Sequence, residues 1–175
     1  MKDDAQILVT GRLWLGVDGA RSIGSVLVDM FNSAKQEVIV VAYRLTAGHG
    51  QLREALESSL ARGMIVKIVI NKEKDQHPVE KAFIDELLKR YSNLSVWDFD
   101  DDKNDMNVAL HAKLVVADRS RAVIGSANFS KNGLLENHEI AVCVSGSQAR
   151  STCVLVETLI DQGLKTGVLK KRSVL

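Results

Sequence analysis

The short stretch LHAKLVVA places a histidine, His111, two residues before a lysine, Lys113, in an otherwise apolar run. Ser126 and Asn128 follow in the sequence GSAN. An imidazole, an ammonium, a hydroxyl and a carboxamide are costly to bury without partners, at roughly 1 to 3 kcal/mol each. Because an anion is the natural partner of such a group of side chains, the residue types predict an anion-binding site.

Two short apolar segments around these residues predict a β-hairpin. Residues 110–117 and 122–125 are rich in β-branched side chains, and polar turn-forming residues separate them. A two-residue loop, Arg119-Ser120, would pair the polar residues across the strands, Lys113 with Ser126 and His111 with Asn128. Because side chains alternate along a strand, this register places all four on one face of the sheet.

The pattern HxKxxxxDxxxxxxGSxN resembles the signature of the phospholipase D superfamily of phosphodiesterases. Its fixed positions in this sequence are His111, Lys113, Asp118, Gly125, Ser126 and Asn128. The flanking segments VIVVAYRLT, ALESSLARGMIVKIVI and NFS, and the pair Asn137 and Glu139, look like the same family. The resemblance covers about residues 20–160 and implies the phospholipase D-like fold and phosphodiester chemistry.

The resemblance also implies a role for each residue of the site. His111 is the expected nucleophile, which attacks phosphorus and forms a phosphohistidine, and a second histidine is the general acid and then the base. Lys113 and Asn128 are expected to bind the non-bridging oxygens, and Ser126 is a weaker candidate for the same role. Glu139 is expected to accept a hydrogen bond from the far nitrogen of His111 and fix its tautomer. The alternative for Glu139 is a surface carboxylate at the end of a strand.

Asp118 and Gly125 belong to the pattern but are interpreted as structural residues. Seven residues along a strand correspond to about 23 Å, so Asp118 cannot touch the phosphate that His111 attacks. No metal or other cofactor is expected. The acidic segment 100–105 lacks the glycine and the closing glutamate of a calcium-binding loop, and we interpret it as a solvated loop.

The mechanism of the family requires two histidines at one phosphate, but the pattern occurs once in this chain. The other histidines, His49, His77 and His138, have no lysine two residues later. A homodimer with C2 symmetry that brings two copies of His111 to one site is therefore predicted. The two imidazoles would share their protons, which predicts a bell-shaped dependence of activity on pH.

Segments with helical and strand patterns alternate along the chain. Apolar residues at helical spacing predict helices at about 23–31, 52–60, 78–88 and 148–164. Apolar, β-branched runs predict further strands at 37–43, 65–70, 94–99 and 138–145. This order predicts an α/β fold, with a mostly buried mixed sheet flanked by helices on both faces. We expect a single domain, 1–175, with a basic, frayed C-terminal tail at about 165–175.

The composition, with 46% hydrophobic and 26% charged residues and a net charge of +1, is typical of a globular domain without an overall field that would attract a polyanion. No stretch approaches the roughly 18 apolar residues of a membrane span, and the N-terminal residues do not resemble a signal peptide. The two cysteines lie in apolar surroundings, which is typical of reduced thiols. We therefore expect a cytoplasmic protein without a membrane span.

Short members of the superfamily with one copy of the pattern resemble bacterial endonucleases more than lipases. The leading hypothesis is therefore a metal-independent endonuclease that acts on DNA or RNA with little sequence preference. The basic residues expected to follow a nucleic-acid backbone are Arg44, Lys72, Lys74, Arg119, Arg121, Lys131, Lys165, Lys170, Lys171 and Arg172. Two alternatives stay open: a phosphodiesterase for phospholipids or cardiolipin, and a non-catalytic nucleic-acid-binding module of a larger complex.

Overall fold

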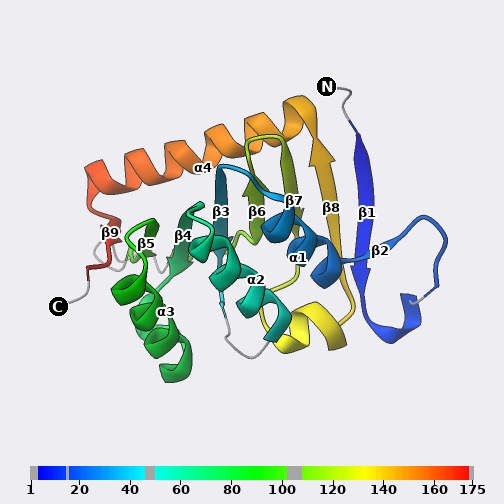
Figure 1. Cartoon of the computed structure of the whole chain (residues 1–175), viewed down its shortest axis with the longest axis horizontal. Coiled ribbons are helices and arrows are strands. Elements are labelled where there is room, and N and C mark those ends of the chain that lie inside the picture. The colour runs from blue at the N-terminus through cyan, green and yellow to red at the C-terminus, as the bar shows by residue number, and fades with distance from the viewer. Residues whose placement is uncertain (1–3, 15, 46–49, 102–107, 174–175) are drawn as a thin grey trace.

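The computed structural model describes residues 4–14, 16–45, 50–101 and 108–173. Within this part of the chain nine strands form one sheet, in the order β2-β1-β8-β7-β6-β3-β4-β5-β9 (Figure 1). The strands are β1 (Ala5–Thr10), β2 (Arg21–Ser22), β3 (Glu37–Ala42), β4 (Ile65–Asn71), β5 (Leu94–Phe99), β6 (Leu114–Ala117), β7 (Arg121–Gly125), β8 (Glu139–Ser145) and β9 (Leu169–Lys171). Strands β3, β4 and β5 run parallel, whereas β6, β7, β8 and β1 alternate in direction beyond β3. The sheet is therefore mixed, as predicted.

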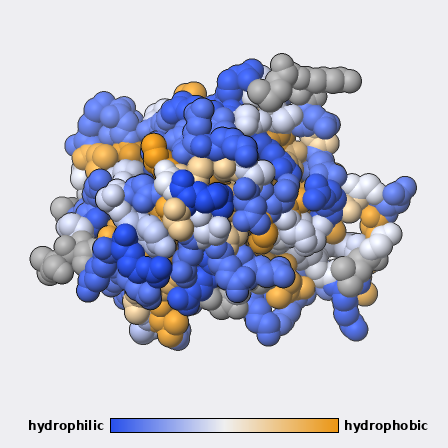
Figure 2. All heavy atoms as spheres, viewed as in Figure 1, coloured by the Kyte–Doolittle hydropathy of each residue, from blue (hydrophilic) through white to orange (hydrophobic). Residues whose placement is uncertain are grey.

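Helices cover both faces of this sheet. Helices α1 (Ile23–Ser33), α2 (Gly50–Ala61) and α3 (Pro78–Arg90) lie in front of it in Figure 1, and α4 (Gly146–Thr166) runs across it from β8 to β9. The surface seen over α1, α2 and α3 is mostly hydrophilic, with hydrophobic residues in small separate groups (Figure 2). The helices and strands confirm the predicted α/β fold.

Strand β3 illustrates how the sheet builds two cores. All of its residues, Glu37 to Ala42, are buried. Val38 and Val40 belong to the core beneath α1, α2 and α3, whereas Ile39 and Val41 belong to the core beneath α4. Because side chains alternate along a strand, a sheet covered on both faces requires an uninterrupted apolar run.

One edge of the sheet gathers the ends of β3, β4, β7 and β1 together with the beginnings of β6 and β8. The pairing of Val41 with Leu114 and of Gly125 with Ala141 defines this edge, which we call the site edge. Strands β6 and β8 both run antiparallel to β7, so they begin at the edge where β7 ends. Segments that are distant in the sequence therefore meet here.

The predicted register of the β6–β7 hairpin is wrong by one residue. Ala117 pairs with Arg121, so the loop contains residues 118–120 rather than two residues. Lys113 consequently lies opposite Gly125, whose N–H donates to the Lys113 carbonyl at 3.1 Å. Two loop residues have positive φ angles, 49° and 55°, and this conformation is rare enough that a polar turn sequence does not predict it. The four polar residues also lie beyond the strand ends, so strand alternation does not decide where their side chains point.

The described part of the C-terminal tail, residues 165–173, is not frayed, contrary to the prediction. Strand β9 pairs antiparallel with β5, with Leu169 opposite Phe99, and Leu169 is buried in the core beneath α4. Arg172 forms ion pairs with Glu73 and Asp85 at 2.8 and 2.6 Å. Strand β9 covers the outer edge of β5, whose backbone groups would otherwise be open to pairing with another chain.

Other predictions concern single segments. Strand β1, which was not predicted, lies between β2 and β8 in the sheet. Both cysteines, Cys143 and Cys153, are free and buried. Within the described ranges no helix has the length and apolar character needed to cross a membrane. Most of the acidic segment 100–105 lies outside the described residues.

Candidate active site

The residues of the HxK and GSxN patterns gather at the site edge. His111 and Lys113 come directly before β6, and Ser126 and Asn128 come directly after β7. Glu139 is the first residue of β8. Because β7 lies between β6 and β8, its end is adjacent to the beginnings of both neighbours. The strand order therefore brings the residues into one place.

Asn71, at the end of β4, anchors the segment that carries His111. Its side chain is buried, and its Oδ1 accepts a hydrogen bond from the backbone N–H of Leu110 at 2.7 Å. Sequence reasoning did not select Asn71. The available signal was a polar residue at the end of the apolar run IVKIVIN.

The ammonium of Lys113 is directed at His111. Its Nζ lies 3.0 Å from each ring nitrogen of His111 and donates to the His111 carbonyl oxygen at 2.8 Å. Lys113 is only 6% exposed. This burial lowers the pKa of its amine, and the nearby charge of Glu139 opposes the shift. A poorly solvated cation interacts strongly with an anionic oxygen, so the ammonium is well suited to bind phosphate.

Tyr43 forms one wall of the site. It follows the end of β3, and its ring centroid lies 4.7 Å from that of His111, with 58° between the planes. The Nζ atom of Lys113 lies 5.2 Å from the centre of the same ring. Sequence reasoning did not select Tyr43 as a site residue, although it lies in the segment VIVVAYRLT that resembles the family.

Ser126 and Glu139 bind each other. The hydroxyl of Ser126 donates to Oε2 of Glu139, and the side-chain amide of Asn137 donates to Oε1 at 3.3 Å. The expected hydrogen bond between Glu139 and His111 is not formed among the described residues, where the carboxylate has these two partners instead. Glu139 nevertheless influences the site, since its charge raises the pKa of Lys113.

Asn128 lies against the chain that follows it. A Cβ atom on Gly133 would lie 2.3 Å from the backbone oxygen of Asn128, so only glycine fits at position 133. The Oδ1 atom of Asn128 is buried and has no hydrogen-bond partner in the part of the chain that the structure describes. Unpaired buried polar atoms are rare in folded proteins, and each one calls for an explanation such as a ligand.

Asp118 lies in the turn expected for it, at the far end of the hairpin from His111. Its carboxylate accepts hydrogen bonds from the backbone N–H groups of Lys35, Gln36 and Glu37 at 2.7 to 3.0 Å. Burial alone would raise the pKa of Asp118, but these donors outweigh it and lower the pKa below its ordinary value. Asp118 therefore connects the hairpin turn to the start of β3.

Two of the basic residues predicted to follow a nucleic acid lie away from the site edge. Arg119 and Arg121 are at the opposite edge, where β6 and β7 are connected. Arg119 pairs with Glu37 and Glu157, and Arg121 pairs with Asp29. Arg119 lies in the turn of the hairpin and Arg121 is the first residue of β7. The HxK and GSxN residues lie at the other ends of β6 and β7, so these arginines are a strand length away from them.

The other described histidines have structural contacts. His138 packs edge-to-face on Trp14, with ring centroids 5.3 Å apart, and accepts a hydrogen bond from the N–H of Leu13. His77 caps the N-terminus of α3, where its Nδ1 accepts from the N–H of Val79 at 3.3 Å. Neither contact places these rings beside His111, and His49 lies outside the described residues.

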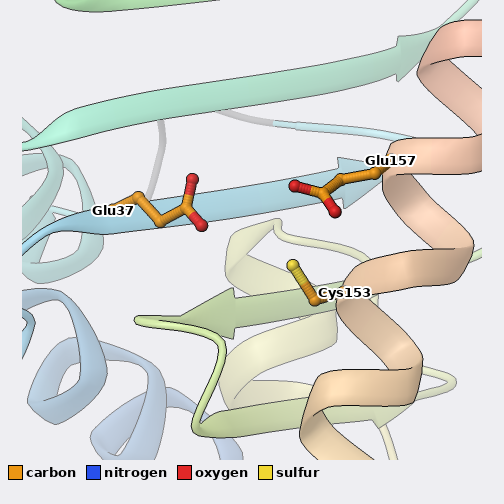
Figure 3. A group of neighbouring side chains, drawn as sticks. All are labelled: Glu37, Cys153 and Glu157. Atoms are coloured by element: carbon orange, nitrogen blue, oxygen red, sulfur yellow. The ribbon is translucent and has the colours of Figure 1, made fainter.

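A second cluster of chemically active side chains lies on the α4 side of the sheet. Glu37, Cys153 and Glu157 have ligand atoms within 4.8 Å of one another, and Figure 3 shows the two carboxylates directed toward each other above the thiol. Lys67 and Arg119 each bind Glu37 at 3.0 Å, and Arg119 also binds Glu157. These cations already compensate the carboxylates, so the cluster forms an ionic link between α4 and the sheet.

Comparison with known proteins identifies the family. The profile described as "Cardiolipin synthase, PLD-like domain" matches residues 27–155, which is most of the chain and includes the whole pattern from His111 to Glu139. The chain belongs to the phospholipase D superfamily. A curated relative, the DISARM protein DrmC of Bacillus paralicheniformis, is 29% identical over 127 residues. That match covers 71% of this chain and 50% of DrmC, so this phospholipase D-like chain spans about half the length of its relative.

Solved structures have the same phospholipase D fold. The chain superimposes on Nuc, a phospholipase D family member of Salmonella typhimurium, with a TM-score of 0.71 and 22% identity, over 98% of this chain and 99% of Nuc. NucT of Helicobacter pylori gives a TM-score of 0.71 and 21% identity, over 94% and 97% of the two chains. A phosphatidylserine synthase of Haemophilus influenzae gives 0.69 and 13%, over 97% of this chain but 40% of the synthase.

Proposed function

We propose that this protein is a metal-independent phosphodiesterase, an endonuclease for DNA or RNA that works through a phosphohistidine in a homodimeric site. The contact between the buried ammonium of Lys113 and the imidazole of His111 carries the proposal. It supplies a nucleophile and a cation at one point on the site edge. The donor set supports metal independence, because the charged groups among the described site residues are one ammonium and one carboxylate already bonded to Ser126.

The chemistry proceeds in two steps. In the first, a ring nitrogen of His111 attacks phosphorus, a P–N bond forms, and the P–O bond to the leaving group breaks while a second imidazole gives that oxygen a proton. In the second, water attacks phosphorus, loses a proton to the second imidazole, and the P–N bond breaks. Lys113 and Asn128 bind the non-bridging oxygens and stabilise the charge that develops on them.

The second imidazole comes from the His111 of another copy of the chain. An uncovered apolar area beside the site supports this dimer. Ile7, Ile124 and Ile140, which we call the isoleucine patch, are 54%, 39% and 52% exposed. Their strands β1, β7 and β8 are neighbours, and Val142 pairs with both Ile7 and Ile124.

The isoleucine patch lies on the α4 side of the sheet. Ile124 lies two residues from Ala122 on β7, so the two side chains share a face. Ile140 shares a face with Val144 of β8 for the same reason. Both Ala122 and Val144 pack in the core beneath α4. Helix α4 begins at the opposite end of β8 from Glu139, so it does not cover the patch. Ile140 directly follows Glu139, and a second copy that covered these residues would be held next to the catalytic groups.

Nucleic acid is the proposed substrate because of the cations near the site edge. Arg44 is exposed and follows Tyr43 directly, and its guanidinium lies 5.7 Å from the centre of the Tyr43 ring. Lys131 follows the GSxN segment and is 63% exposed, and its ammonium forms a surface ion pair with Glu136 at 3.1 Å. Exposed cations on two segments that follow strands ending at the site edge favour a substrate with several phosphates in a row.

Cleavage assays in EDTA test the proposal. The purified protein is incubated with single-stranded DNA, duplex DNA, RNA, a chromogenic phosphodiester and cardiolipin vesicles. We expect nucleic-acid cleavage that persists in EDTA, is lost in His111→Ala and is kept in the matched control His77→Ala. Labelled substrate should leave phosphate on the wild-type chain after rapid denaturation.

The outcomes separate the alternatives. Activity that disappears in EDTA would contradict the metal-free mechanism, and equal activity of His111→Ala and wild type would contradict the site. Faster turnover of cardiolipin than of any nucleic acid would favour the lipid alternative. Tight nucleic-acid binding without turnover would favour the binding module.

A further inference from the structure

The Tyr43 ring contacts both groups that the proposed chemistry needs. It lies 4.7 Å from the His111 imidazole, centre to centre, and 5.2 Å from the ammonium of Lys113. Tyr43 follows the end of β3, whereas His111 and Lys113 precede the beginning of β6. The contacts therefore join two segments that are distant in the sequence. Val41 pairs with Leu114 just inside the edge, so the backbone fixes the distance between the two segments.

His111 needs a support other than Lys113. In the resting site Nζ of Lys113 lies 3.0 Å from both ring nitrogens. A phosphate oxygen competes for this ammonium, since a charge-assisted hydrogen bond to an anion is stronger than one to a neutral ring. When the ammonium turns to the substrate, the imidazole loses that contact at the moment when its orientation decides the attack.

The carboxylate of Glu139 does not hold the ring in this structure, because its partners are Ser126 and Asn137. Among the residues that the structure describes, the other side-chain contact of the imidazole is the aromatic one with Tyr43. Aromatic rings at this distance and tilt attract one another more strongly than their buried area alone would predict. The Tyr43 side chain has only two rotatable bonds and is half-buried, so it can support the imidazole firmly.

We propose that Tyr43 is a positioning residue for His111. Its ring keeps the imidazole aimed at phosphorus while Lys113 moves to the substrate, and its π face offers the ammonium a second favourable position. The proposal rests on the proposed function, since it concerns the attack step. Its active part is the aromatic ring, so the hydroxyl is dispensable.

Kinetics of matched variants test this role. We expect Tyr43→Leu and Tyr43→Met to lower kcat about 10- to 100-fold with little change in KM, as a misaimed nucleophile does. Tyr43→Phe should restore kcat to near the wild-type value. Tyr91→Leu is the control, because Tyr91 is the other tyrosine and packs against the core beneath α3. It should lower the unfolding temperature without lowering kcat.

A second measurement does not depend on activity. In the NMR spectrum the ring protons of His111, assigned with His111→Asn, should shift between wild type and Tyr43→Leu and stay close to wild type in Tyr43→Phe. Unchanged His111 signals in Tyr43→Leu would overturn the proposal even if no substrate were cleaved. Equal kcat in Tyr43→Leu and Tyr91→Leu, or equal loss in Tyr43→Phe and Tyr43→Leu, would overturn it as well. A protein that cleaves nothing but has the expected shifts would contradict the proposed function alone.

Discussion

At the scale of single residues, the site depends on one buried cation. Lys113 is 6% exposed, and its ammonium contacts the residue that it would assist in catalysis, His111. Burial destabilises the charged form of the amine, which is why its pKa is lowered. The folded protein therefore tolerates an unfavourable charge that a phosphate would stabilise, a common trade of stability for function.

Replacing Lys113 with methionine should separate stability from activity. We expect kcat to fall at least about 100-fold, because a donor to the developing charge is lost. The free energy of unfolding should be unchanged or higher, because a poorly solvated ammonium is replaced by an apolar chain of similar length. Urea unfolding and single-turnover cleavage measure the two quantities. Lys89→Met, at an exposed position of α3, is the control for the loss of a positive charge.

The same replacement should change how stability depends on pH. The pKa of Lys113 is lower in the folded chain than its ordinary value of 10.5. Between these two values the unfolded chain binds the proton and the folded chain does not, so the stability of the wild type should rise with pH in that interval. Unfolding curves at several alkaline pH values measure this slope. A slope in Lys113→Met equal to that of the wild type would mean that other groups cause it.

At the scale of elements, the sequence predicts strands and helices well wherever burial decides them. The run EVIVVAY predicts β3 almost to the residue because both of its faces are covered, and α3 begins at Pro78 as expected. Strand β9 escaped prediction because the tail sequence is basic. Its place follows from the exposed edge of β5, a feature of the tertiary structure that no local pattern contains.

For the candidate site, the grouping of the residues could be predicted from the sequence, but the contacts of individual atoms could not. The spacing of the HxK and GSxN patterns indicates that the groups act together, and strand order does bring them to one edge. The partners of individual atoms depend on the turn at Asp118 and on side-chain rotation, which set the register and pair Glu139 with Ser126. Tyr43 was missed because its contact with His111 spans two strands.

Asp118→Asn tests the structural role of the hairpin turn. The change weakens hydrogen bonds to the N–H groups at positions 35 to 37, and we expect a loss of about 1 to 2 kcal/mol in the free energy of unfolding. The specific activity of the folded protein should be retained. Asp161→Asn, on the exposed side of α4, is the control and should change stability little.

The stabilising effect of Asp118 also depends on pH. Because its folded pKa is lowered, its contribution is present above the ordinary pKa of an aspartate and is lost as the pH falls through the folded value. The difference in stability between wild type and Asp118→Asn should therefore shrink in acid. A difference that stayed constant down to about pH 2 would argue that the carboxylate acts by shape rather than by charge.

At the scale of the whole molecule, the proposed reaction requires two chains. Two copies of His111 at one phosphate must differ in protonation, one neutral to attack and one charged to donate. We therefore expect kcat/KM to rise and then fall with pH, giving a bell-shaped profile. A profile with a single limb across the range from pH 4 to 10 would fit a site with one working imidazole and would contradict the shared site.

If the proposed dimer forms through the isoleucine patch, this patch holds the two chains where the chemistry needs them. Charging it with the double substitution Ile124→Lys and Ile140→Lys should make the protein monomeric and abolish cleavage, because apolar contacts would become buried, unpaired ammonium groups. Ile65→Lys is the matched control, since Ile65 is 50% exposed at the start of β4, away from the site edge, and its replacement should leave both mass and activity unchanged. Sedimentation equilibrium gives the mass, and the EDTA assay gives the activity. A double variant that is monomeric and still cleaves would show that one copy of His111 suffices, whereas an active dimer would place the interface elsewhere on the molecule.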